Sequence, residues 1–502
     1  MSKPRPWIAV LVFAAALLPR LLIVLTPIPT QLDKVLPDDA YYYFLTAQNI
    51  VRSGSPSVDG LHPSNGWHPL WMLANTTIYS LPYSDPDLPV RLVLGLGAVC
   101  DSLAAALIFL GTRRFVGEAA AAVGGLSYAV NTMPMFQSVN GLETGLAALC
   151  IAGAWMLTLR LTDKPTPLNA ALWGGVFGLT FLARTDTALI LVPLGLYALW
   201  RLRRSIPLVV VGAAVAGIVV APWLLWNQAN FGSFLEQSSS NAVPWAARAR
   251  FLMENPESAQ FGESLRVLLH APYWLRGDYL GAPPLMGFVL WLLALWGMYR
   301  ARQQALSQIA LLLLLGGAAL LLVHTLVRWY PRPWYFVVTA QSLALGLALF
   351  WHVTESKRIK LAMLAFGLVG MVAFGWMAWQ IGYYPWQQTH QYAAALWARD
   401  NLPADARLAS MNSGIIGYYS GRTTVNLDGV VNPAAFEAIQ NYRLLDFMRE
   451  TEVDYFLDSD NALQSEYAPF MGESYPAKLE TWQPLTEEYA GLGRLWIYRV
   501  LE

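Results

Sequence analysis

Long apolar stretches recur from the first residues of this chain to about residue 380, and they restrict its fold more than any other feature. Stretches of roughly 17–25 apolar residues are long enough to cross a bilayer as helices. Only 13% of the 502 residues are charged, about half of the share that is usual in soluble domains. The sequence therefore predicts a polytopic α-helical membrane protein.

About eleven such stretches can be counted, and the basic residues between them predict their orientation. The stretches cover residues 7–29, 88–111, 117–139, 142–160, 168–184, 187–201, 206–228, 283–300, 305–327, 334–352 and 359–380. Basic clusters occur in alternate gaps, at Lys3 and Arg5, Arg113 and Arg114, Arg160 and Lys164, Arg201 to Arg204, Arg300 and Arg302, and Lys357 to Lys360. Because cytoplasmic loops carry an excess of Lys and Arg, we expect the N-terminus inside and the C-terminus outside.

The chain is predicted to have a membrane domain and a smaller outer domain. Residues 1–380 hold the spans, with two long outer loops at 30–87 and 229–282. Two helical stretches of the first loop are expected to lie along the membrane surface. Residues 381–502 alternate polar and apolar residues and predict a small extracytoplasmic α/β domain. The surface helices are expected at 38–53 and 67–82, the strands at 407–412, 423–428, 454–458 and 494–500, and one further helix at 433–440.

Polar residues that could take part in chemistry collect on the predicted outer side. The acids are Asp38, Asp39 and Glu143, and the cations are Arg184, with Asp186 close by, Arg328 and Arg332. Aromatic and polar side chains accompany them in the first outer loop, namely Tyr41, Tyr42, His62, Asn65, Trp67 and His68. Ionisable residues at membrane depth are costly and usually functional. We therefore expect these groups to converge on one cavity at the outer leaflet.

Such a cavity suits the transfer of a sugar from a lipid phosphate. A hydroxyl acceptor needs a general base, and a carboxylate within hydrogen-bond reach can serve. Arginine forks bind phosphate oxygens and can stabilise the leaving phosphate. The aromatic side chains can stack on sugar rings. One set of residues thus offers a base, a leaving-group stabiliser and a sugar platform.

Each candidate also has a purely structural interpretation. Asp38 can cap the helix that begins near Asp39. Glu143 can cap the fourth span, because the dipole at the N-terminus of a helix favours an acid. Arg184 and Asp186 can form an ordinary salt bridge, and Arg328 and Arg332 can be interfacial arginines. His62 and His68 can hydrogen-bond their own loop instead of a metal. Arg20 and Asp101, deep in the first two spans, are expected to form a structural pair.

Several segments resemble a known group of proteins. The segments DDAYYYFLTAQNI, NGWHPLW, NGLETGL, FLARTD and GYYSGRTTVNLDGVVN are similar to those of bacterial members of the GT-C superfamily. This superfamily of integral-membrane glycosyltransferases includes protein O-mannosyltransferases, the lipid A aminoarabinose transferase and oligosaccharyltransferases. The resemblance covers nearly the whole chain, but its motifs are poor indicators of a particular substrate.

The resemblance implies an inverting glycosyltransferase in the bacterial cytoplasmic membrane. Its donor would be a polyprenyl-phosphate-linked sugar, and its acceptor a hydroxyl of a cell-envelope glycan, lipid or protein. If the acidic motif is matched to that of the mannosyltransferases, the base would be Asp38. If it is matched to that of the oligosaccharyltransferases, the base would be Asp39, which we favour. Glu143 would be a second acid. Some relatives use a divalent metal ion and others do not, so the resemblance leaves a metal cofactor open.

Two other classes of function were weighed. A transporter would need charged residues along a path through the membrane, whereas here they gather at one face. A ligase or polymerase that uses a polyprenyl diphosphate would usually lack an acidic pair just after the first span. The formal net charge of zero gives no indication of a nucleic-acid partner.

Overall fold

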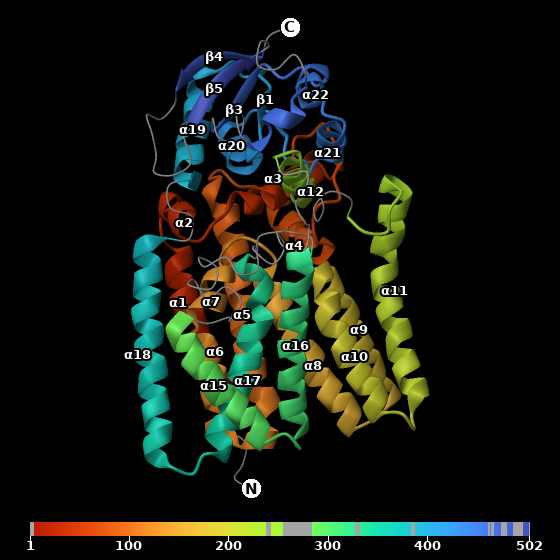
Figure 1. Cartoon of the computed structure of the whole chain (residues 1–502), viewed down its shortest axis with the longest axis vertical. Helices are drawn as coiled ribbons and strands as arrows, with labels where there is room; N and C mark the ends of the chain where they lie inside the picture. Colours follow the sequence, from red (N-terminus) through yellow and green to blue (C-terminus); the bar gives the residue numbers. More distant parts are fainter. Residues whose placement is uncertain are drawn as a thin grey trace.

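The computed structural model describes residues 5–236, 242–254, 284–326, 332–382, 387–459, 462, 466–472, 479–484 and 495–500. A bundle of long helices forms the lower part of the molecule in Figure 1, and a small sheet with helices on both sides lies over one end of it. The helices α18 and α11 flank the bundle on opposite sides (Figure 1). The C-terminal sheet and the helices of residues 30–87 meet at the same end of the bundle (Figure 1).

Each predicted span contains a helix. These helices are α1 (Trp7–Val24), α5 (Asp87–Val116), α6 (Glu118–Ala129), α8 (Thr144–Asp163), α9 (Pro167–Ala183), α10 (Ala188–Arg201), α11 (Ile206–Phe231), α15 (Pro284–Arg300), α16 (Ala305–Leu326), α17 (Val337–Val353) and α18 (Lys357–Ile381). In the described part of the chain, seven helical stretches are long and apolar enough to cross a membrane. The chain is therefore a multi-pass membrane protein, while the number of spans and their orientation stay predictions.

The predicted span 117–139 is not one helix. The helix α6 ends at Ala129, and a separate short helix, α7 (Thr132–Gln137), follows it. The side chain of Asn131 accepts a hydrogen bond from the backbone N–H of Met133 at 3.1 Å, which caps α7. The apolar composition concealed this break because hydropathy does not register a capping residue.

The predicted pair of Arg20 and Asp101 is confirmed. Arg20 donates from Nε and Nη2 to Asp101 Oδ2 at 2.9 and 2.5 Å, and neither side chain is more than 1% exposed. The hydroxyl of Tyr128 donates to Asp101 Oδ1 at 2.6 Å. Buried ions need this kind of full pairing, so the triad ties α1, α5 and α6 together and is structural.

Three helices lie in the first loop. They are α2 (Ile28–Lys34), α3 (Asp38–Ser53) and α4 (Pro69–Tyr79). The helix α3 has the predicted bounds, and it ends at Gly54, which adopts a left-handed φ of 75° that glycine tolerates best. The helix α4 is shorter than predicted because Pro69 occupies its first turn and the helix ends before Pro82.

The C-terminal region contains a five-stranded mixed sheet of order β2-β1-β3-β5-β4. Its elements are α19 (Gln387–Asn401), β1 (Leu408–Ser410), α20 (Ser413–Ser420), β2 (Thr424–Asn426), α21 (Pro433–Gln440), α22 (Leu444–Glu450), β3 (Tyr455–Ser459), η4 (Ala468–Phe470), β4 (Leu479–Pro484) and β5 (Leu495–Val500). β1 runs parallel to β2 and β3, and β5 runs antiparallel to β3 and β4. Four strands and the helix at 433–440 occur where they were predicted, and β4 was not predicted.

The C-terminal region docks through α20 onto α3. The backbone N–H groups of Gly414 and Ile415 donate to Asp38, and the hydroxyl oxygens of Tyr41 and Tyr419 are 3.1 Å apart. A Cβ added at Gly414 would lie 2.5 Å from the carbonyl oxygen of Asp38. A side chain at this position would therefore force the two helices apart.

We expect Gly414→Ala to weaken this docking. The added methyl group meets backbone, which cannot move aside as a flexible side chain would, and overpacking typically costs about 1–3 kcal/mol. The measurement is the rate at which a protease removes the C-terminal region in detergent. Gly95→Ala is the matched control, because a Cβ at Gly95 meets nothing within 4 Å. Equal cleavage rates for the two variants would contradict the prediction.

Candidate active site

A cavity of about 120 Å³ opens where the first loop, the membrane bundle and the C-terminal region meet. Its walls come from α3, the residues before α4 and α8, the end of α9, the η2 turn (Pro333–Phe336) and the segment after β2. The lining residues are Asp39, Tyr42, Tyr43, Thr46, Gly66, Trp67, His68, Leu142, Glu143, Arg184, Trp334, Tyr335, Val430 and Val431. Elements far apart in the sequence thus build one cavity, and Asp39, Glu143 and Arg184 all line it.

The two neighbouring aspartates of α3 face different surroundings. Asp38 is only 4% exposed, and its Oδ1 and Oδ2 accept hydrogen bonds from the N–H groups of Ile415 and Gly414 at 2.7 and 3.1 Å. It caps α20, therefore, and makes no capping bond in its own helix. Burial raises the pKa of the Asp38 carboxyl to about 7, although the bond from Ile415 opposes this shift. Asp39, about 100° further around the helix, lines the cavity.

The charge of Asp39 is set by its surroundings in the cavity. Its side chain is accessible at the open cavity, while the protein around it reduces its hydration. This burial is the main reason why the pKa of Asp39 is raised, and the negative charge of Glu143 adds to the increase. The positive charge of Arg332 acts in the opposite direction. A carboxylate with a raised pKa and room for a ligand beside it has the properties of a general base.

A second acid, Glu143, also lines the cavity and belongs to a network of hydrogen bonds. Glu143 accepts from the Tyr43 hydroxyl and from Arg184 Nη1, both at 3.0 Å. Arg184 donates its remaining two groups, Nε and Nη2, to Asp186 at 2.9 and 2.7 Å, and its guanidinium lies 4.6 Å over the Tyr335 ring. The predicted salt bridge of Arg184 and Asp186 is therefore present. Glu143 is the N-cap residue of α8, where the helix dipole favours an acid as expected, but its side chain makes no capping hydrogen bond and joins this network instead.

Several predicted ligand-binding residues lie at the cavity, and others lie outside its wall. Tyr42, Trp67 and His68 line it. Tyr41 instead packs between α3 and α20, and Asn65 donates to Asn227 Oδ1 at 3.1 Å. These positions depend on the packing of α20 and α11, which local sequence does not reveal. Arg328 falls outside the described residues, while Arg332 acts on Asp39 through its charge.

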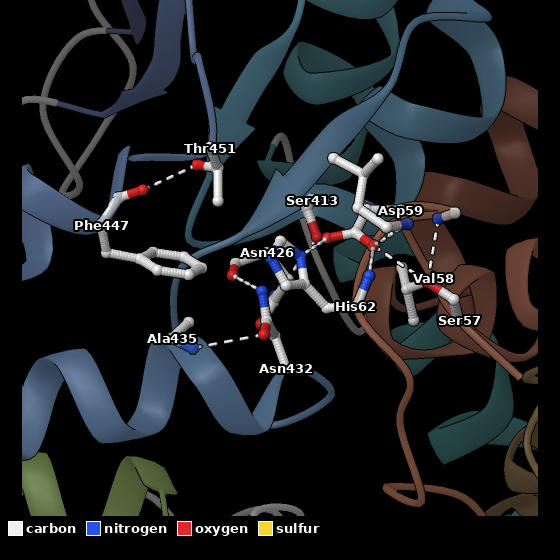
Figure 2. A network of polar contacts seen from close by, with 12 residues as sticks. Ser57, Val58, Asp59, His62, Ser413, Asn426, Asn432, Ala435, Phe447 and Thr451 are labelled. Carbon is white, nitrogen blue, oxygen red and sulfur yellow. Dashed lines mark hydrogen bonds and ion pairs between the residues drawn. The ribbon is translucent and has the colours of Figure 1, made fainter. Parts of the chain in front are cut away.

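His62 also lies away from the cavity. Figure 2 shows it beside Asp59, and its Nδ1 is 2.8 Å from Asp59 Oδ2. Its ring is 5.4 Å from that of Phe447 in α22. The loop hydrogen bond was the structural alternative for this residue, and it is present. His62 therefore contributes to the contact between the first loop and the C-terminal region.

The segment after β2 belongs to the site, and sequence reasoning missed its functional residues. Val430 and Val431 line the cavity, and a Cβ at Gly66 would lie only 2.6 Å from the Val430 carbonyl oxygen. The side chain of Asn432 donates to the Asn426 carbonyl oxygen and accepts from the N–H of Ala435 (Figure 2). These bonds fix the conformation of the segment, and the close approach at Gly66 places it against the first loop.

Asp428 is a further acid in this segment. Its Oδ1 accepts from the N–H of Val430 at 2.8 Å. Burial raises the pKa of Asp428 to about 8, and the nearby charge of Asp39 adds to the shift. The Asp-Gly pair after a predicted strand was the available signal, but it indicates only a turn.

The sequence left open whether the protein uses a metal cofactor, and the described residues do not form a set of metal ligands. Within the described ranges, no three His, Cys, Asp or Glu side chains are grouped so that they could hold a metal ion. His68 Nε2 is 3.8 Å from Glu143 Oε1, and this pair alone is too small a set.

Comparisons with known proteins agree with this architecture. A family model described as dolichyl-phosphate-mannose-protein mannosyltransferase matches residues 72–226, and a model of a domain of unknown function matches residues 378–498. No curated protein matches this chain in sequence. ArnT from Cupriavidus metallidurans bound to undecaprenyl phosphate is similar in structure, with a TM-score of 0.59, 13% identity and 97% of each chain covered.

The oligosaccharyltransferase of Archaeoglobus fulgidus is similar as well. Its apo form has a TM-score of 0.57 at 14% identity, over 93% of this chain and 71% of that one. The complex of this archaeal enzyme, AglB, with an inhibitory peptide and a dolichol-phosphate has a TM-score of 0.53, also at 14% identity, over 92% and 70% of the two chains. At such identities the structural matches show the fold alone, and together with the mannosyltransferase family model they agree with the predicted resemblance to the GT-C superfamily.

Proposed function

We propose that this chain, whose fold is that of the GT-C glycosyltransferases, transfers a sugar from a polyprenyl-phosphate-linked donor to a hydroxyl acceptor. The observation that carries the proposal is the position of Asp39, an acid with a raised pKa that is exposed in a cavity beside the charge of Arg332. The undecaprenyl phosphate bound to ArnT and the dolichol-phosphate bound to AglB support a lipid phosphate as ligand of this fold.

In the proposed reaction Asp39 accepts the proton of the acceptor hydroxyl. The acceptor oxygen then attacks the anomeric carbon of the donor on the face opposite its phosphate. The bond between that carbon and the phosphate oxygen breaks, and polyprenyl phosphate leaves with the bonding electrons. The new glycosidic bond has the inverted anomeric configuration. Positioning of the acceptor beside the base supplies much of the rate enhancement.

The cations of the site have different roles in this proposal. Arg332, with Arg328, binds the donor phosphate and stabilises the charge that develops on it. Arg184 was predicted to bind phosphate too, but the three nitrogens of its guanidinium group donate to Glu143 and Asp186. In the proposed site Arg184 therefore holds Glu143 in position in the wall of the cavity.

The proposed activity is tested with purified protein in detergent. Short-chain polyprenyl-phosphate sugars are offered together with an extract of bacterial envelope glycans, and the released lipid is identified by mass spectrometry. Release of polyprenyl phosphate, dependent on Asp39, supports the proposal. Release of a diphosphate would instead favour a ligase or polymerase, and turnover of neither lipid would reject transfer from lipid-linked sugars.

We expect Arg332→Ala to weaken binding of the lipid phosphate. A hydrogen bond to a charged group contributes about 1.5–3 kcal/mol, so the affinity for farnesyl phosphate should fall by about 10- to 100-fold. Arg332→Lys should restore the charge but not the planar fork, and rescue only in part. Unchanged affinity in the alanine variant would place the phosphate elsewhere.

The site is proposed to face the outside of the bacterial cytoplasmic membrane. Arg358 at the start of α18 and Asn441 after α21 are both exposed. Single cysteines at these positions, in a chain lacking Cys100 and Cys150, should react oppositely with a membrane-impermeant thiol reagent on intact cells. Labelling at 441 alone agrees with the predicted orientation, and labelling at 358 refutes it.

A further inference from the structure

Three buried polar atoms next to the cavity have no hydrogen-bond partner. They are Nδ1 of His68, Nε1 of Trp223 and Oε1 of Glu236. Trp223 and Glu236 are each 7% exposed. Buried polar atoms are nearly always satisfied, and each unpaired one costs about 1–3 kcal/mol. A ligand with matching donors and acceptors would satisfy all three.

The three residues are neighbours, although they come from separate parts of the chain. Glu236 follows the end of α11, and its carboxyl lies close enough to Trp223 of that helix to be stabilised by its indole N–H, although no hydrogen bond of ordinary geometry joins them. The charge of His68 acts on Glu236 and favours its ionised form, against burial, which raises the pKa of this group. His68 in turn lines the cavity that holds Asp39. The orphan atoms therefore border the proposed reaction site.

Hydrogen bonds of Asn227 hold the segment that carries Glu236 close to the first loop. Asn227 of α11 accepts from Asn65 at 3.1 Å and donates to the Phe234 carbonyl oxygen at 3.4 Å. The first loop and the segment that carries Glu236 are thus tied to the same side chain. Such support keeps a binding residue in one position before the ligand arrives.

The chemistry of the three atoms fits hydroxyl groups. An indole N–H only donates, a carboxylate only accepts, and an imidazole nitrogen can do either. A hydroxyl both donates and accepts, so two neighbouring hydroxyls can satisfy the whole set. An ammonium group only donates and would leave the Trp223 N–H unpaired.

An aromatic wall adjoins the orphan atoms. The Trp67 ring, which lines the cavity, is 4.7 Å from that of Trp223, and the Trp223 and Trp226 rings stack at 5.2 Å. Apolar ring faces beside a carboxylate match a pyranose, which has C–H groups on its faces and hydroxyls at its edge. The carboxylate of Glu236 would repel a free phosphate or any other negatively charged ligand.

We propose that Glu236, His68 and Trp223 form a subsite for the hydroxyls of a sugar ring, with Glu236 as the specificity-determining residue. This inference rests on the proposed glycosyl transfer and names the part of the substrate that this corner of the site binds. The sugar belongs either to the donor or to the acceptor. Both have the same hydroxyl chemistry, so the experiment has an arm for each.

The first arm compares the affinities of farnesyl phosphate and of farnesyl-phosphate-linked mannose, glucose and galactose for the whole protein in detergent. If the donor sugar is bound here, at least one sugar improves the affinity, and Glu236→Ala removes this gain by about tenfold or more while the affinity for farnesyl phosphate is unchanged. The second arm measures binding of methyl mannoside, glucoside and galactoside by NMR. If the acceptor sugar is bound here, the variant loses this signal instead.

Controls keep the outcomes separate. Glu236→Gln retains the shape and one acceptor oxygen, and it should fall between wild type and the alanine variant. Glu254→Gln removes a carboxylate that is 64% exposed on α12 (Ala242–Glu254), and it should behave as wild type. Wild-type binding of farnesyl phosphate with no Glu236-dependent sugar effect in either arm overturns the subsite and leaves the proposed function standing. Absence of lipid-phosphate binding overturns both.

Discussion

Asp39→Asn is expected to lower sugar transfer by about 10²–10⁴-fold, the usual contribution of a general base. Asparagine keeps the shape of the side chain but cannot accept the proton of the acceptor hydroxyl. Asp39 lines an open cavity, so the substitution disturbs no packed contact and folded yield should be kept. The measurements are the transfer rate and, separately, the affinity for farnesyl phosphate.

Asp38→Asn is the matched control for this result. Both carboxyl oxygens of Asp38 accept backbone N–H groups of α20, and an amide can keep only part of that arrangement. We expect weaker docking of the C-terminal region and a smaller loss of transfer. If Asp38→Asn lost more activity than Asp39→Asn at equal folded yield, the base would be Asp38. Normal transfer by the double variant would remove this loop from the chemistry.

The pH dependence gives an independent check of the same base. The base works in its ionised form, so activity should rise with pH through the pKa of Asp39, which lies above the ordinary value because of burial. Arg332 lowers this pKa, so Arg332→Ala should move the acidic limb of the profile to higher pH.

Arg184→Met should destabilise the protein by about 3–5 kcal/mol, the usual cost of leaving a buried charge without its partner. The Arg184 and Glu143 side chains are only 6% and 5% exposed. Methionine fills similar space but leaves Glu143 and Asp186 facing each other without a cation. The measurement is the temperature of unfolding in detergent, followed by the intrinsic fluorescence of the tryptophans.

The matched control for Arg184→Met is Arg114→Met. The pair of Arg114 and Asp163 is exposed, at 42% and 59%, and such pairs contribute about 0–1 kcal/mol. The control should unfold near the wild-type temperature. Equal shifts in the two variants would show that the network of Glu143, Arg184 and Asp186 is not a buried, mutually dependent unit.

The sequence was sufficient for those features that local pattern encodes. Apolar length located a helix in each predicted span, and Pro37 with Gly54 marked the bounds of α3. Alternation revealed four of the five strands. The clustering of Asp39, Glu143 and Arg184 on one side of the membrane followed from charge and span counting, and these residues do line one cavity.

Only the tertiary structure decided which member of each candidate set faces the cavity. Asp38 and Asp39 are adjacent and chemically identical, and the docking of α20 onto one of them separates their roles. Tyr42 lines the cavity whereas Tyr41 packs against α20, and Val430 and Val431 reach the cavity from a position distant in sequence. Hydropathy and charge patterns are properties of single segments, whereas side-chain direction at a site depends on contacts between segments. That is why the sequence by itself determined the membrane bundle and the set of candidate acids, and packing alone determined which acid is exposed in the cavity.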